Sequence, residues 1–210
     1  MKIAFFSWRK CKITKFNEVL EGTKELRKIM GWNGLEGSAI LHSPGDNLNN
    51  LSAHYRRFNS VEEMNDYYED LRKNKLSEVM SKISDINENC VAYWNSRVEI
   101  LEPIEGIDVK DTDYSYLMWH RWKAKRGHIA DLVDLLRDMR EKMEGSKPNI
   151  IKPISGDMQY ISMVKPIKTL TEVPSFDQAR ERLEKNKSLV QKLQDFTETH
   201  ERYFPALIRD

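Results

Sequence analysis

The sequence has few of the features that mark a specialised class of protein. Its two cysteines, Cys11 and Cys90, form no CxxC pair, so neither a disulfide framework nor a cysteine-based zinc site is expected. Both thiols are predicted to be ordinary packing residues in a reducing, cytoplasmic setting. No apolar run approaches the roughly 18–20 residues of a membrane span. The short apolar stretch near the N-terminus lacks the length and the cleavage site of a signal peptide.

The chain also lacks an excess of charge of one sign. Lysine and arginine number 34 and aspartate and glutamate 33, for a formal net charge of +1. No broad field therefore attracts nucleic acid or anionic lipid, and neither partner is expected. Hydrophobic residues make up 40% of the chain, which is too many for a disordered protein and indicates a folded, soluble one.

Motifs for nucleotide binding, hydrolysis and metal binding are absent as well. The chain contains no GxGxxG, GxxxxGK[ST] or GxSxG, so nucleotide-binding and α/β-hydrolase functions have no support. Its five histidines make no HExxH or HxH spacing, and no metal site is predicted. The sequence by itself requires no cofactor.

What the sequence does contain is an internal repeat. Lys-Asn-Lys at 73–75 recurs at 185–187, and Arg9 in FSWRK recurs as Arg121 in MWHRW, both 112 positions later. A period of this length is too long for a solenoid unit and predicts a duplicated domain. Lysine-rich helices that match by coincidence are the alternative.

Hydrophobic periodicity predicts the same order of elements in both halves, because a spacing of two indicates strands and a spacing of three and four indicates helices. Ser60 and Glu63 also form a capping box at the start of a helix. The last strand is expected near 202, so close to Asp210 that it is short or the natural chain continues. The predicted elements are strand 2–11, helix 15–30, strands 37–43 and 50–58, helix 60–83 and strand 90–101, then strand 114–122, helix 128–143, strands 149–154 and 158–165, and helix 174–198.

Each half therefore has the βαββαβ order of a ferredoxin-like unit. The strands carry apolar or aromatic side chains at successive positions, so both faces of each sheet are expected to be covered. Helices would cover one face and the sheet of the other copy the second. We predict an α+β chain of two tandem ferredoxin-like repeats forming an intrachain dimeric α/β barrel, with the first repeat at 1–102, a linker at 103–112 and the second repeat at 113–210.

This arrangement resembles the dimeric α/β-barrel superfamily, which includes antibiotic-biosynthesis-type monooxygenases, haem-degrading monooxygenases and stress-responsive barrel proteins. The resemblance spans nearly the whole chain and depends on element order, period and strand character. It implies a protein that binds a small hydrophobic molecule, as a monooxygenase or isomerase acting on an aromatic substrate, with haem as a candidate cofactor. A non-catalytic ligand-binding or stress-response barrel and a structural or interaction protein are the alternatives. The assembly would be a monomeric pseudo-dimer or a homodimer.

One candidate site lies in the strand that opens the second half. Strand alternation places His120 with Trp122 on one face and Trp119 with Arg121 on the other. Indole rings beside an imidazole suit a planar aromatic ligand, and an arginine can bind a carboxylate or phenolate. Tryptophans in the core and an arginine directed to solvent are the alternative.

The first half offers a second group. His54 and Arg56 share a strand face, whereas their expected counterparts, near Lys165 and Pro166, differ in character. At most one half is therefore expected to hold a working pocket, and a solvated strand end is the alternative. Arg9 is expected to be equivalent to Arg121. We predict His120 and His54 as catalytic residues, and as ligand-binding residues Trp8, Arg9, Arg56, Trp119, Arg121 and Trp122.

Overall fold

The structure is a computed structural model, and it describes residues 1–33, 38–44, 50–106 and 114–208. The chain divides into two compact units. Unit 1 comprises Met1–Glu99 and Pro205–Asp210, and unit 2 comprises Ile100–Phe204. The predicted repeat boundaries stay a prediction, and most of the predicted linker, at 107–112, lies outside the described residues. Within the described ranges, no helix is both long and apolar enough to span a membrane.

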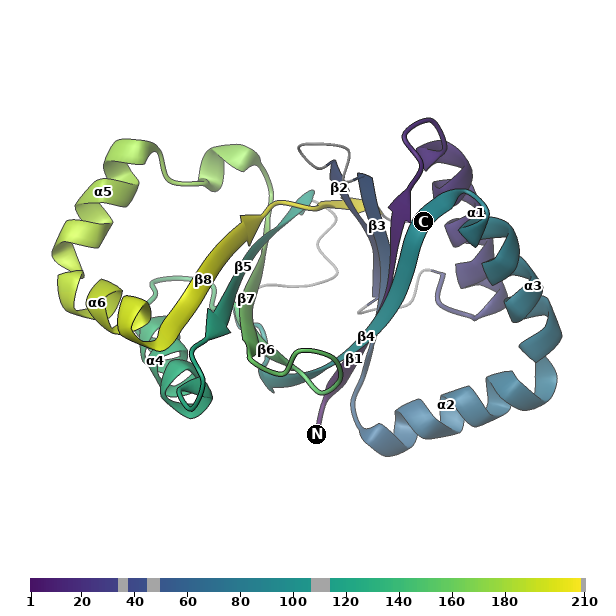
Figure 1. The fold of residues 1–210 in the computed structure, drawn as a ribbon, viewed down its shortest axis with the longest axis horizontal. Coiled ribbons are helices and arrows are strands. Elements are labelled where there is room, and N and C mark those ends of the chain that lie inside the picture. Colours follow the sequence, from purple (N-terminus) through teal and green to yellow (C-terminus); the bar gives the residue numbers. More distant parts are fainter. Residues whose placement is uncertain (34–37, 45–49, 107–113, 209–210) are drawn as a thin grey trace. The chain divides into compact units, whose positions relative to one another are not determined.

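Unit 1 is an antiparallel sheet with helices on one face (Figure 1). Its strands pair in the order β4-β1-β3-β2-β9. Both faces of β1 are buried from Ile3 to Phe6, as its run of apolar residues predicts. The elements are β1 (Ile3–Cys11), α1 (Phe16–Ile29), β2 (Ser38–Pro44), β3 (Asn50–Phe58), α2 (Val61–Asn74), α3 (Leu76–Asn87), β4 (Cys90–Glu102) and β9 (Ala206–Ile208).

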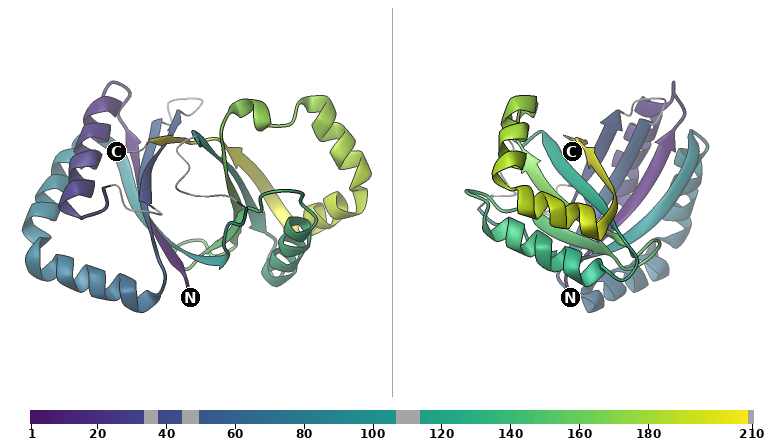
Figure 2. Two further views of the ribbon diagram at one scale, coloured as in Figure 1. Left: turned by 180° about the vertical axis from the view of Figure 1, so that it is seen from behind. Right: turned by 60° about the vertical axis from the view of Figure 1, so that its left-hand side comes forward.

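Unit 2 has a four-stranded antiparallel sheet, and its helices also lie on one face (Figures 1 and 2). The strand order is β6-β7-β5-β8. Trp122 of β5 packs against Leu132 and Leu136 of α4 in the apolar core. The elements are β5 (Tyr116–Ala124), α4 (Ile129–Glu141), β6 (Asn149–Pro153), β7 (Tyr160–Ile167), the short 3-10 helix η2 (Leu170–Glu172), α5 (Phe176–Lys185), α6 (Lys187–Phe196) and β8 (Thr197–Tyr203).

Local signals explain two helix boundaries in unit 1, the start of α2 and the end of α1. Ser60 caps α2, since its Oγ accepts a hydrogen bond from the Glu63 amide at 3.1 Å. The Glu63 carboxylate, however, accepts from the Asn59 amide at 2.7 Å and not from Ser60. The predicted capping box is therefore correct in its first half and shifted by one residue in its second. After α1, Gly31 adopts a φ of 68°, a conformation that glycine tolerates and other residues rarely do.

The end of unit 2 differs from the prediction. The expected helix at 174–198 is two helices, interrupted at Asn186, whose ψ of 31° is not helical. The last long strand begins at Thr197 and not near 202, because the second helical pair is shorter than the first and a constant period displaces the strand. His200, which follows the expected helix 174–198 in the sequence, consequently lies inside β8 and pairs with Trp122 of β5.

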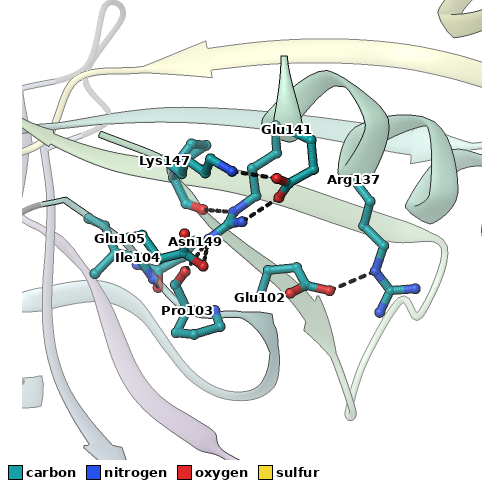
Figure 3. Close-up of polar contacts among 10 residues, drawn as sticks. Glu102, Pro103, Ile104, Glu105, Arg137, Glu141, Lys147 and Asn149 are labelled. Carbon is teal, nitrogen blue, oxygen red and sulfur yellow. Dashed lines mark hydrogen bonds and ion pairs between the residues drawn. The ribbon is translucent and has the colours of Figure 1, made fainter. Parts of the chain in front are cut away.

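A buried arginine anchors the segment that follows β4. Pro103, Ile104 and Glu105 of this segment are labelled in Figure 3. Arg140 of α4 is 2% exposed. It donates to the carbonyl oxygens of Pro148 at 2.9 Å and Pro103 at 2.6 Å, and it pairs with Glu105 at 2.9 Å. The Ile104 amide donates to Asn149 Oδ1 of β6 at 2.7 Å. The first residues of the predicted linker are therefore packed against unit 2.

Candidate functional site

The helix-covered face of the unit 1 sheet carries buried polar side chains. The antiparallel register pairs Ser7 of β1 with His54 of β3, and Arg9 with Ser52, so strand alternation directs them to one face. Arg9 is 3% exposed, Ser52 1% and His54 2%. Arg9 Nε donates to Asn87 Oδ1 of α3 at 3.3 Å, which places this face beneath the helices.

Five buried side-chain atoms on this side of unit 1 have no hydrogen-bond partner among the described residues. Hydrogen bonds satisfy the large majority of buried polar atoms, and each unsatisfied one costs about 1–3 kcal/mol. Five together call for partners beyond the described side chains, such as water or a ligand. We refer to them as the polar cluster, which consists of Trp32 Nε1, Ser52 Oγ, His54 Nδ1, Arg56 Nε and Tyr68 OH.

Aromatic rings connect the members of the polar cluster. The Trp32 and His54 rings meet edge to face with centroids 5.1 Å apart. Phe5 contacts the Trp32 ring at 6.1 Å and the Tyr68 ring at 5.7 Å. The Arg56 guanidinium lies 4.6 Å from the centre of the Phe58 ring. The polar atoms are therefore set among apolar rings, as in sites that bind small organic molecules.

Burial and positive charge determine the protonation of these groups. Burial lowers the pKa of His54 well below its usual value, and the Arg9 and Arg27 guanidinium groups lower it further. Its imidazole is therefore neutral near pH 7. Burial raises the pKa of Tyr68 and raises that of Tyr67 to about 12. Both phenols thus keep their protons, and the site has many donors and a positive potential.

The corresponding face of unit 2 is mainly apolar, apart from His120 and His200. Trp122 pairs with Ile161 and His120 with Met163, whereas Arg9 pairs with Ser52 and Ser7 with His54. The register shift between Lys10 and Cys11 recurs between Lys123 and Ala124, which aligns the two units. Ile161 and Met163 then occupy the places of Ser52 and His54, and both belong to the apolar core of unit 2. Among the described residues, the buried polar atoms without partners lie in unit 1, whereas the two histidines on the equivalent face of unit 2 hydrogen-bond each other.

The same alignment corrects the predicted equivalence of Arg9 and Arg121. Trp122 stands at the place of Arg9, one residue beyond the predicted counterpart. A shift of one residue moves a strand's side chains to the opposite face. Arg9 accordingly lies beneath the helices. Arg121 lies on the other face, 3.6 Å from the Tyr160 ring centre and 3.8 Å from Glu201.

His120 belongs to a compact stack in unit 2. Its Nδ1 lies 3.0 Å from Nε2 of His200, and both rings stack on Trp122, with centroids at 5.5 and 4.9 Å. Burial, together with the charges of His200 and Arg202, lowers the pKa of His120 to about 4. The two imidazoles hydrogen-bond each other as neutral rings.

The structure brings together only some of the predicted site residues. His54, Arg9 and Arg56 share the helix-covered face of unit 1. Trp8 lies on the opposite face, where its Nε1 donates to Ser96 Oγ at 3.2 Å and its ring stacks on Trp94. A site that combines the two halves stays a prediction.

The remaining predicted residues belong to unit 2. His120 and Trp122 share its helix-covered face, whereas Trp119, which is 9% exposed, and Arg121 lie on the other. Trp32 and Tyr68 were not expected at a site. The sequence offered only one hint, namely that both side chains carry a hydrogen-bond donor and lie near predicted strands in the sequence. In the described ranges, no group of three or more histidine, cysteine or acidic residues could hold a metal ion.

No protein-family model matches the sequence, and no curated protein matches it significantly. Solved structures do resemble it. A provisionally assigned monooxygenase from Fusobacterium nucleatum has a TM-score of 0.67 at 12% identity, over 99% of this chain and 93% of the other. An anthrone oxidase-like protein has a TM-score of 0.64 at 10% identity, over 99% and 92%.

A provisionally assigned monooxygenase from Lactobacillus acidophilus is also similar, with a TM-score of 0.57 at 8% identity, over 99% of this chain and 93% of the other. Identities this low establish the fold alone. The chain has the α+β, dimeric α/β-barrel fold that the sequence predicted.

Proposed function

We propose that this chain is a small-molecule-binding protein of the monooxygenase type, and that its ligand occupies the polar cluster of unit 1. The observation that supports this most directly is the group of five buried polar atoms without partners. A ligand that hydrogen-bonds to them would remove a cost that the ligand-free protein bears. The apolar counterpart in unit 2 supports a single working site, with the second unit in a supporting role.

The cluster indicates the chemistry of the ligand. Trp32, Arg56 and Tyr68 present N–H or O–H donors, and their surroundings are aromatic. A complementary molecule carries acceptor oxygens on an aromatic skeleton, such as an aromatic ketone, quinone or phenolate. The names of the three similar structures, two provisionally assigned monooxygenases and an anthrone oxidase-like protein, agree with such a substrate.

His54 is the proposed catalytic base. A neutral, buried imidazole can accept a proton from an acidic C–H or O–H group of the substrate, and the guanidinium groups of Arg9 and Arg56 would stabilise the resulting anion. Such an anion can react with dioxygen. Conversion of a ring methylene to a carbonyl consumes one O₂ and releases one water, so the substrate supplies all the electrons and no external reductant is needed.

Haem remains a candidate cofactor that a spectrum can test. His54 would be the residue to hold haem iron, because a histidine that binds a metal must be neutral and burial keeps the pKa of His54 well below its usual value. Its ring, however, already packs against Trp32 at 5.1 Å, which favours a smaller aromatic molecule. We therefore expect no Soret band shift when haem is added to the purified protein.

The finer assignments extend the same proposal. The strand order β4-β1-β3-β2 in unit 1 and β8-β5-β7-β6 in unit 2 supports two tandem ferredoxin-like repeats. A cytoplasmic location is consistent with two free thiols. Whether the chain acts as a monomeric pseudo-dimer or as a homodimer can be measured by sedimentation.

Calorimetric titration with anthrone, a hydroxynaphthoquinone and benzoate tests the site. We expect at least one aromatic oxygen compound to bind, and His54→Leu to weaken its binding at least tenfold. The matched control is His120→Leu, which alters a histidine of unit 2 and should leave the affinity unchanged. Equal binding by wild type and His54→Leu would place the ligand elsewhere. Binding without oxygen consumption would favour a non-catalytic ligand-binding protein.

A further inference from the structure

The two cysteines of the chain lie opposite each other in unit 1. The sequence predicted unrelated packing thiols, but the antiparallel pairing of β1 with β4 sets Cys11 against Cys90, next to a register shift at Lys10 and Cys11. Directly opposed residues in such a pair have Cα atoms about 4.5–5.5 Å apart, within the span of about 4.4–6.8 Å that a disulfide bridges. Both thiols are free. Their separation in sequence had concealed the contact.

A buried arginine stands beside this pair. Arg9 precedes Cys11 by two residues and shares its strand face. Its side chain hydrogen-bonds Asn87, and no carboxylate of the described residues forms an ion pair with it. A buried cation without a counter-ion is costly. Ionisation of Cys90 or Cys11 would place a thiolate within electrostatic range of this guanidinium.

The two thiols differ in exposure and in protonation. Cys11 is 1% exposed, whereas Cys90 is half-buried. A hydrogen bond from Cys11 lowers the pKa of Cys90, burial opposes this, and the charges of Arg9 and Lys12 lower it further. The same hydrogen bond and burial raise the pKa of Cys11. As a neutral thiol, Cys90 donates to the Ile86 carbonyl at 3.3 Å, a contact it would give up on ionisation.

We propose that Cys90 and Cys11 form a peroxide-reactive dithiol, with Cys90 as the attacking thiolate, Cys11 as the resolving thiol and Arg9 as the counter-ion. The oxidant is hydrogen peroxide or an organic hydroperoxide. The Cys90 thiolate attacks one peroxide oxygen, the O–O bond breaks, and water or an alcohol leaves after taking a proton. Cys90 is then a sulfenic acid. The Cys11 sulfur attacks it, a water leaves, and an S–S bond forms.

The reaction balances in both atoms and electrons. Two thiols are oxidised by two electrons, and one hydroperoxide is reduced to one alcohol and one water. An external thiol can reduce the disulfide again by exchange. The two thiols lie outside the polar cluster, and the two proposed sites share only Arg9. Thiol oxidation is read from the mass of the chain and the oxygenase site from ligand binding, so the failure of one proposal can be distinguished from the failure of the other.

Treatment of the full chain with a small excess of hydrogen peroxide tests this assignment. We expect loss of both thiols, a monomer whose mass is lower by two hydrogen atoms, and a peptide map that joins Cys11 to Cys90, all reversed by dithiothreitol. This measurement uses the wild-type chain, so it does not depend on a variant that folds. Two thiols that persist, or a disulfide between chains, would overturn the proposal.

Substitutions then assign the roles. Cys11→Ser should halt the reaction at a sulfenic acid on Cys90 that dimedone traps, and Cys90→Ser should leave Cys11 unmodified over the same time. Arg9→Met should slow oxidation by roughly tenfold, because a nearby cation favours the reactive thiolate. Arg121→Met is the matched control and should react at the wild-type rate. Oxidation of Cys11 in Cys90→Ser at the wild-type rate would refute the assigned order.

Discussion

Removing the hydroxyl of Tyr68 tests the central feature of unit 1. The Tyr68 hydroxyl is buried and has no hydrogen-bond partner among the described residues. Tyr68→Phe deletes that one oxygen and keeps the ring, which contacts Phe5 at 5.7 Å. The neighbouring Tyr67 offers a matched control, since its hydroxyl donates to the Met30 carbonyl at 2.9 Å. Both side chains belong to α2, and their rings touch at 5.2 Å.

The two substitutions should change stability in opposite directions. A buried hydroxyl without a partner costs about 1–3 kcal/mol, so Tyr68→Phe should raise the free energy of unfolding by about 1 kcal/mol or more. Tyr67→Phe removes a made hydrogen bond, worth about 0.5–1.5 kcal/mol, and should lower the free energy of unfolding. The difference between the variants, expected at about 2 kcal/mol or more, is the quantity to measure.

Urea unfolding followed by circular dichroism gives that difference by linear extrapolation. Both variants should retain the wild-type m value, because the surface exposed on unfolding is nearly the same. Equal losses of stability would show that the Tyr68 hydroxyl has a partner, such as an ordered water, and would refute the reasoning. If the hydroxyl contacts the ligand, Tyr68→Phe should also weaken the binding of the aromatic compound while it stabilises the ligand-free protein.

Three further predictions concern pH, helix packing and a buried charge. In the folded protein the pKa values of His54 and His120 lie below those of the unfolded chain, and the pKa of His120 falls to about 4. The stability that these neutral rings contribute is present above about pH 6.5 and is lost as the pH falls toward 4, by up to about 1.4 kcal/mol per pH unit for each histidine. A pH series of urea midpoints should show the slope, and a flat profile would contradict it. Gly22→Ala in α1 should lower the melting temperature, because the new Cβ would lie 2.8 Å from Ile86 Cγ1 and overpacking costs about 1–3 kcal/mol. In the Ile86→Ala background, which lacks Cγ1, Gly22→Ala should lower the melting temperature less, and this is the expected control. Arg140→Met should cost about 1–3 kcal/mol in urea unfolding, because the carbonyls of Pro103 and Pro148 lose their donor, whereas the half-exposed Glu105 can be solvated. A loss below about 1 kcal/mol would show that water replaces the guanidinium.

Part of the candidate site could be anticipated from the chain alone. Alternation along β3 was enough to place His54 and Arg56 on one face. Trp32 and Tyr68 could not be assigned to the same site, because they come from a helix end and from α2, and only helix packing brings them to the sheet. The pairing of Cys11 with Cys90 was hidden because it depends on the register of β1 against β4, two strands far apart in the sequence.

The repeat shows how far a sequence offset can be trusted. A spacing of 112 residues found both copies, but in the first strands the copies align one residue further along. That difference is minor for element order and decisive for side-chain direction, because strand faces alternate with every residue. Arg9 and Arg121, which the offset of 112 had matched, therefore lie on different faces of their respective sheets.

The sequence by itself determined the order of strands and helices and the alternation within each strand. These follow from local periodicity, which depends only on residues a few positions apart. Tertiary structure decided which face of each sheet the helices cover, where β8 begins and which distant side chains meet. Those outcomes depend on strand register and on packing between segments tens of residues apart. Local periodicity determines neither of these. The same strand pattern consequently gives a polar, incompletely hydrogen-bonded interior around His54 in unit 1 and an apolar core around Met163 in unit 2.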